Sequence, residues 1–164
     1  TRQYFSSERY TIFCNSSLSH CVPIINGFSQ HAGATYGGSI AVNGDTVTLE
    51  IGGAYPADVG SITRTFTIGE KSVQLTDVWT DKVNSFTERF VSVIEPTVTA
   101  GAVRFAQCTL HFDPQTVTPT VSVEKHYTHD YKKDATHSAL PQSVYCVDFS
   151  VDPALGMITF SFDM

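Results

Sequence analysis

A polar segment that ends in a histidine is the part of the sequence best suited to chemistry. Residues 15–19 read Asn-Ser-Ser-Leu-Ser, His20 follows, and Cys21-Val-Pro-Ile-Ile leads to Asn26-Gly27. Such a pattern is typical of a polar loop that enters a buried strand. His20 could ligate a metal or line a site. A lone histidine is not by itself a metal site, and a histidine bonded to a backbone carbonyl is the alternative.

Arg64 is the second candidate, because it interrupts an otherwise apolar strand face. Its guanidinium fork matches a carboxylate, which could belong to Asp77 or Glu88 or to an acidic sugar. Tyr36 and Tyr55 offer aromatic faces on which a sugar ring could stack. Aromatic residues of a β-sandwich more often belong to its core, so both interpretations stay open.

The elements that must position these residues are strands. The 164 residues are the length of one domain, 41% of them are hydrophobic and only 16% are charged, and no long helix-forming run is present. Short alternating runs separated by turn signals predict an antiparallel two-sheet β-sandwich of about ten or eleven strands. The clearest is a hairpin around Asn43-Gly44, a dipeptide that suits a tight turn. We expect strands at 8–14, 22–26, 39–42, 46–51, 61–68, 72–79, 86–94, 102–112, 117–125, 143–151 and 157–162, with a turn at 96–101 and a long polar connection at 126–141.

Charge and composition exclude several classes of function. The formal net charge is −6 and the basic residues are scattered, so neither nucleic acid nor an anionic membrane is an expected partner. No apolar run approaches the roughly 20 residues of a membrane helix. The four cysteines show no metal-finger spacing, and we expect free thiols, with a Cys14–Cys21 or longer-range disulfide as the alternative. The chain starts at Thr1, so we expect it to be part of a longer protein.

Several segments together resemble the C-terminal β domain of heparinase II/III-like polysaccharide lyases. The most specific is Ser-x-x-His-x-x-Pro-x-Ile-x-Gly-x-x-Gln, which here begins at Ser17 and ends at Gln30. Cys21 departs from the pattern, because these lyases often carry Asn directly after the histidine. The similarity runs from about Tyr4 to at least Cys146. Its other parts are Tyr10, Gly53-Ala-Tyr-Pro56, Arg64-Thr-Phe-Thr-Ile68, Thr76-Asp77 and Glu88-Arg-Phe-Val-Ser92.

The resemblance implies a supersandwich-like β domain that packs against an upstream helical toroid. In such lyases a uronic-acid polysaccharide, often a glycosaminoglycan, is cleaved by β-elimination between the two parts. The catalytic groups lie mostly upstream, so this chain alone is expected to be inactive and to line the groove. Some members hold a structural zinc through two upstream residues and the histidine that matches His20. The compartment stays open between periplasmic or secreted and cytoplasmic.

The alternative is a non-catalytic module that binds carbohydrate or is purely structural. A binding module should hold an oligosaccharide by itself, whereas an accessory domain of a lyase should bind little alone. An accessory domain could also expose an apolar patch when separated from its toroid, and a homodimer through such a patch is a further expectation.

Overall fold

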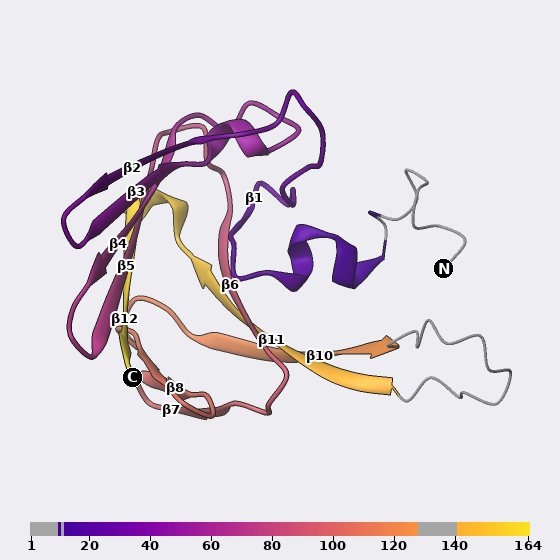
Figure 1. Cartoon of the computed structure of the whole chain (residues 1–164), viewed down its shortest axis with the longest axis vertical. Helices are drawn as coiled ribbons and strands as arrows, with labels where there is room; N and C mark the ends of the chain where they lie inside the picture. Colours follow the sequence, from indigo (N-terminus) through magenta and orange to yellow (C-terminus); the bar gives the residue numbers. More distant parts are fainter. Residues whose placement is uncertain (1–9, 11, 128–140) are drawn as a thin grey trace, which may run out of the picture.

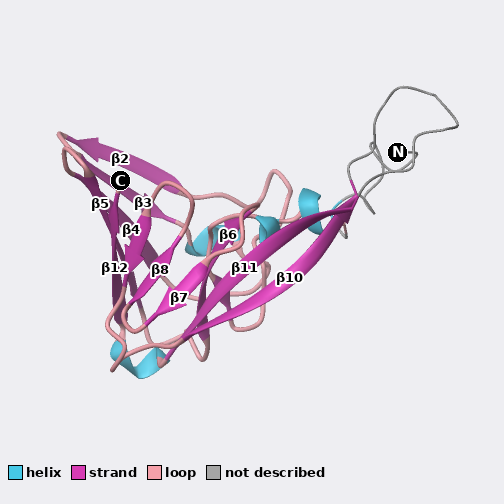
Figure 2. Cartoon of the chain, turned by 90° about the horizontal axis from the view of Figure 1, so that it is seen from below, coloured by secondary structure: helices cyan, strands magenta, loops and turns pink. Residues whose placement is uncertain are grey.

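The computed structural model describes residues 10, 12–127 and 141–164, and this part of the chain forms two antiparallel sheets. The all-β sandwich predicted from the sequence is confirmed, with twelve strands in the described residues rather than ten or eleven. In Figure 2 the long β10–β11 pair runs away from the eight-stranded sheet, so the two layers diverge toward the far end of that pair.

The strand order defines the two layers. The four-stranded sheet has the order β1 (Ile24–Ile25), β6 (Phe86–Ser92), β11 (Pro141–Val151) and β10 (Pro119–Tyr127). The eight-stranded sheet has the order β2 (Ser39–Asn43), β3 (Thr46–Glu50), β4 (Ile62–Ile68), β5 (Ser72–Trp79), β12 (Met157–Asp163), β9 (Thr109–His111), β8 (Ala102–Arg104) and β7 (Thr97–Thr99). Among the described residues, two short 3-10 helices, η2 (Phe13–Asn15) and η3 (Ser17–Ser19), precede β1, while η4 (Gly52–Ala54) follows β3 and η5 (Pro153–Leu155) joins β11 to β12.

The predicted hairpins form in the register that their turns dictate. Gly44 has a φ of 58° in the turn between β2 and β3, a conformation that glycine adopts at little cost. Val42 then pairs with Val47, and Ile40 pairs with Leu49. The next hairpin places β4 beside β5, so that the apolar faces of both strands point into the sandwich.

The core is a cluster of aromatic and branched side chains between the layers. Phe90 and Phe149 from the smaller sheet meet Phe160 from the larger one edge to face, with ring centroids 4.9 to 5.9 Å apart. Trp79 stacks on Phe86 with centroids 4.2 Å apart. Its indole nitrogen donates to the carbonyl of Pro153 at 2.9 Å, so this large side chain is buried without losing its hydrogen bond.

Four predicted segments differ from the structure. The strand expected at 8–14 is wrong where it is described, because Phe13–Asn15 is a 3-10 helix. The strand expected at 102–112 is broken into β8 and β9 by a turn in which the Phe105 amide donates to the Cys108 carbonyl. The turn expected at 96–101 contains β7. The polar connection expected at 126–141 overlaps the ends of β10 and β11, and its residues 128–140 lie outside the described part.

Candidate functional site

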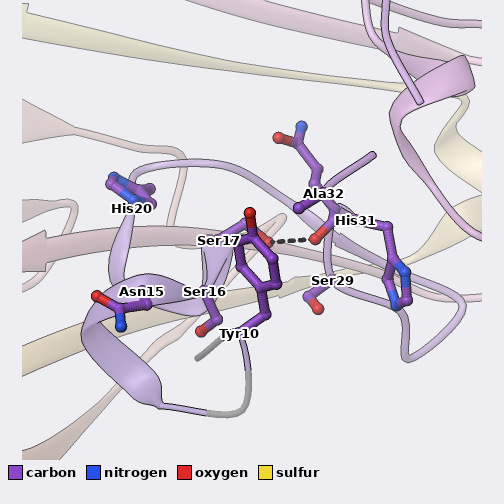
Figure 3. Close-up of a pocket in the computed structure, with 9 residues that line it drawn as sticks. Tyr10, Asn15, Ser16, Ser17, His20, Ser29, His31 and Ala32 are labelled. Atoms are coloured by element: carbon purple, nitrogen blue, oxygen red, sulfur yellow. Dashed lines mark hydrogen bonds between the residues drawn. The ribbon is translucent and has the colours of Figure 1, made fainter. Parts of the chain in front are cut away.

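A pocket lined mostly by residues with polar side chains lies beside the smaller sheet, and His20 is one of these residues (Figure 3). Its volume is about 580 Å³. One side comes from the η2–η3 segment and the other from the stretch after β1, and the Ser17 hydroxyl joins them by donating to the Gln30 carbonyl at 3.2 Å. The lining residues are Tyr10, Asn15, Ser16, Ser17, His20, Ser29, Gln30, His31 and Ala32.

Serine side chains explain why this segment forms tight turns instead of a strand. The Ser16 hydroxyl donates to the Phe13 carbonyl at 2.9 Å, and the Ser19 hydroxyl donates to the Ser16 carbonyl at 3.1 Å. Such local bonds compete with strand pairing for the backbone. The His20 amide then donates to the Ser17 carbonyl at 3.0 Å, which ends the second turn and leaves the imidazole exposed at the pocket.

Three side chains of the sandwich hold the backbone on either side of His20. Arg89 donates to the carbonyl of Leu18 at 3.2 Å, and Arg64 donates to the carbonyl of Cys21 at 3.0 Å. The hydroxyl of Tyr55 donates to the carbonyl of Pro23 at 2.7 Å. We call these three contacts the carbonyl clamp. They fix the backbone path from residue 18 to residue 23, and therefore the position of His20.

Arg64 anchors the clamp in a buried ion cluster that joins the two layers. Its Nε and Nη2 donate to the two oxygens of Asp77 at 2.8 and 2.7 Å, and Nη2 also donates to Glu88 Oε2 at 2.5 Å. Asp77 lies next to Arg64 in the larger sheet, whereas Glu88 comes from β6 across the sandwich. The prediction that Arg64 pairs with Asp77 or Glu88 is confirmed for both carboxylates.

Only one of the two carboxyl oxygens of Glu88 accepts a hydrogen bond from the described residues. Glu88 is fully buried, and its Oε1 has no hydrogen-bond partner among the described residues. Burial raises the pKa of Glu88 well above its usual range, and the neighbouring Asp77 raises it further, while Arg64 acts in the opposite direction. One guanidinium faces two carboxyl groups here, and a protonated Glu88 leaves the cluster with a balanced charge.

The second arginine of the clamp is paired on the other face of β6. Arg89 donates to both oxygens of Asp148 at 2.7 Å, and the two side chains are mostly buried. Sequence reasoning missed this pair. Arg89 and Asp148 are direct cross-strand neighbours of β6 and β11, a pairing between segments 59 residues apart that the sequence does not announce.

The four predicted site residues occupy different positions. His20 faces the pocket, whereas Arg64 and Tyr55 are each 4% exposed and act from behind the backbone that carries it. Tyr36 is half-buried, stacks edge to face on His31 at 5.3 Å, and lines a neighbouring hollow with Glu50. The burial of Arg64 favours the internal ion pair over direct contact with a sugar carboxylate. Gln30 ends the lyase-like segment and Asn15 lies in the polar stretch just before it, but nothing in the sequence singled out His31.

Metal ligation by His20 depends on residues that the described part does not supply. Among residues 10, 12–127 and 141–164, no three His, Cys, Asp or Glu side chains are grouped to hold a metal ion. The described residues therefore do not fit a closed tetrahedral zinc site, which needs four ligands. All four cysteines are free thiols, as predicted.

No family model matches the chain, and no curated protein matches it at a significant level. None of the described helices has the length and apolar character needed to cross a membrane.

The hydroxyl of Tyr55 should matter for stability as well as for the position of His20. We expect Tyr55→Phe to lower the free energy of unfolding by about 1–3 kcal/mol, because the buried Pro23 carbonyl loses its donor. Urea denaturation would measure the change. Tyr36→Phe is the matched control, since that ring lies outside the clamp and should cost less. Equal costs for the two variants would argue against the contact.

Proposed function

We propose that the chain is the β-sandwich domain of a heparinase II/III-like lyase and that its pocket binds part of an acidic polysaccharide. One observation carries the proposal. The segment with the most specific resemblance, residues 17–30, supplies four of the nine residues that line the pocket, and the sandwich holds its backbone with the carbonyl clamp. A loop fixed in this way suits binding, because it loses little conformational freedom when a ligand binds.

The chemistry of the lining suits a sugar. Hydroxyl, amide and imidazole groups can donate to and accept from sugar hydroxyls, and Tyr10 adds an aromatic ring. None of the nine described lining residues is a carboxylate, although the chain as a whole is acidic. An anionic sugar therefore meets less repulsion here than over the rest of the surface.

The role proposed for this chain is to bind and support rather than to cleave. The resemblance assigns the groups for β-elimination mostly to an upstream helical toroid and an upstream part of the sandwich. It assigns two zinc ligands, a His and an Asp, to upstream residues of the sandwich. In the intact protein His20 would be the third ligand of a structural zinc or a wall of the substrate groove. Both roles need the backbone position that Arg64, Arg89 and Tyr55 hold.

Binding of a uronic-acid oligosaccharide tests the proposal. By calorimetry we expect His20→Ala and Asn15→Ala each to weaken the affinity by about two- to tenfold, the loss of one hydrogen bond. His111→Ala is the matched control: this exposed histidine pairs with Asp163 at 3.0 Å, on β9 of the other sheet. Affinity that is unchanged by the two pocket variants, or absent in the unaltered chain, would count against the pocket.

A free-standing carbohydrate-binding module is the second candidate. It is favoured by the fact that one short stretch of this chain builds both walls of the pocket, so no other domain is needed to form it. The two proposals predict different ligands and different binding affinities. Tight binding of neutral oligosaccharides would support the module, whereas weak binding restricted to acidic ones would support the lyase domain.

A further inference from the structure

The strand β2 is a sheet edge, and no other strand among the described residues pairs with its outer side. Of the four sheet edges that the structure describes, β1 is two residues long and β7 is three. The edge strand β10 begins at Pro119 and carries Glu124, both of which discourage pairing with another strand. In contrast, β2 runs over five residues without a proline or a charge and lies on the outside of the larger sheet (Figure 1).

The backbone of β2 offers hydrogen bonds at two residues. Asn43 and Thr46 close a two-residue turn and form the first pair of the hairpin. Pairs then alternate in an antiparallel ladder, so the amide and carbonyl groups of Val42 and Ile40 point away from β3. The side chains of these two residues are 67% and 66% exposed. Free backbone groups and exposed branched side chains therefore coincide on the same strand.

We propose that this edge pairs with β2 of a second copy of the chain to form a two-fold dimer with a continuous sheet. An antiparallel pair centred on Ala41 places Ile40 of each copy opposite Val42 of the other, which are favourable cross-strand partners. The outward amides of both residues then find carbonyls. The strand is thus complementary to itself, as an interface with two-fold symmetry requires.

Charge is compatible with this arrangement. Ser39–Asn43 has no charged side chain, and the first charge beyond it, Asp45, falls opposite Gly37 of the second copy. No like charges meet in the pair. Three more apolar side chains on this face of the larger sheet are only partly covered, and we call them the apolar margin: Ile68 is 47% exposed, and Val47 and Leu49 are half-buried. The second copy would cover part of this margin.

The contact is small, so the dimer should be weak. A five-residue edge with its margin falls at the low end of specific interfaces, which bury about 1,200 Å² or less. We expect a dissociation constant between micromolar and millimolar, seen as a molecular mass that rises with concentration in sedimentation equilibrium.

Charged substitutions at the exposed side chains test the register. Ile40→Lys and Val42→Lys should each weaken association about tenfold or more, since the two-fold axis introduces every change twice. Val123→Lys is the matched control, because Val123 is a 52% exposed valine on the β10 edge. Circular dichroism should show that all three variants stay folded.

Two results would overturn the proposal. A chain that stays monomeric up to millimolar concentration would show that β2 does not pair with a second copy. Association that persists in Ile40→Lys and Val42→Lys, or that Val123→Lys weakens as much, would place the contact elsewhere.

Discussion

Replacing Arg64 with leucine is expected to lower the free energy of unfolding by about 3–5 kcal/mol. The substitution leaves Asp77 fully buried without a cation, and it removes the donor that holds the carbonyl of Cys21. Small proteins are stable by about 5–15 kcal/mol, so this loss is a large fraction of the total. Urea denaturation of the folded chain would measure it.

Arg89→Leu is the matched control for this prediction. Arg89 also binds a carboxylate with two hydrogen bonds and also holds one carbonyl of the clamp, but its ion pair keeps some contact with water. We expect a smaller cost there, about 1–3 kcal/mol, because the Leu18 carbonyl loses its donor while Asp148 keeps some contact with water. A cost at Arg64 no larger than the cost at Arg89 would contradict the view that the buried cluster anchors the two layers.

A triple variant separates the effect of the buried charges on stability from the role of Arg64 in holding the backbone beside His20. Arg64→Met, Asp77→Leu and Glu88→Met together remove the whole cluster, and apolar replacement of a buried ion triad is often neutral for stability. We expect stability to recover toward that of the unaltered chain. The affinity for a uronic-acid oligosaccharide should stay as low as in Arg64→Leu, because the carbonyl of Cys21 still lacks its donor.

Stability should fall as pH rises above about 4.3, the ordinary pKa of a glutamate in an unfolded chain. Glu88 has a raised pKa in the folded state, so above that pH the folded state keeps a proton that the unfolded state has lost. The stability that Glu88 contributes is fully present below its pKa in the unfolded state, and it is lost as pH rises toward its pKa in the folded state. Its slope is about 1.4 kcal/mol per pH unit.

Glu88→Gln isolates this contribution, because glutamine resembles the protonated acid and does not titrate. The unaltered chain also contains groups with the opposite slope, such as Asp58 beside Lys82 and Asp113 bonded to the Gln115 amide, whose pKa values are lowered. The difference in unfolding free energy between the two proteins removes these effects. We expect the glutamine variant to become more stable relative to the unaltered chain as pH rises. A constant difference would mean that Glu88 is ionised in the folded chain.

Much of the fold could be predicted because its information is local. Asn43-Gly44 fixed one hairpin, and the alternation from Ile62 to Ile68 fixed both β4 and the inward direction of Arg64. Two errors have local causes as well. At the end of the first predicted strand, the Ser16 hydroxyl bonds the carbonyl of Phe13, which lies in a 3-10 helix. The turn that separates β8 from β9 contains no glycine or proline, so no signal marked it.

The candidate site was less predictable because tertiary contacts assemble it. His20 stood out through its segment, and the partners of Arg64 followed from side chains on facing strands. His31 and Ser29 reach the pocket only because the chain turns back after β1. The second arginine of the clamp depends on the β6–β11 pairing, and the side chain of Tyr55 proved to hold the backbone from inside.

Mapping a uronic-acid oligosaccharide onto the chain by amide chemical shifts tests the central claim most directly. The pocket predicts that the largest shifts occur in residues 15–20 and 29–32, with little change along β7–β9 at the far side of the larger sheet. It also predicts that His20→Ala reduces them. Shifts centred on another surface, with residues 15–20 undisturbed, would contradict the assignment of this pocket as the saccharide site.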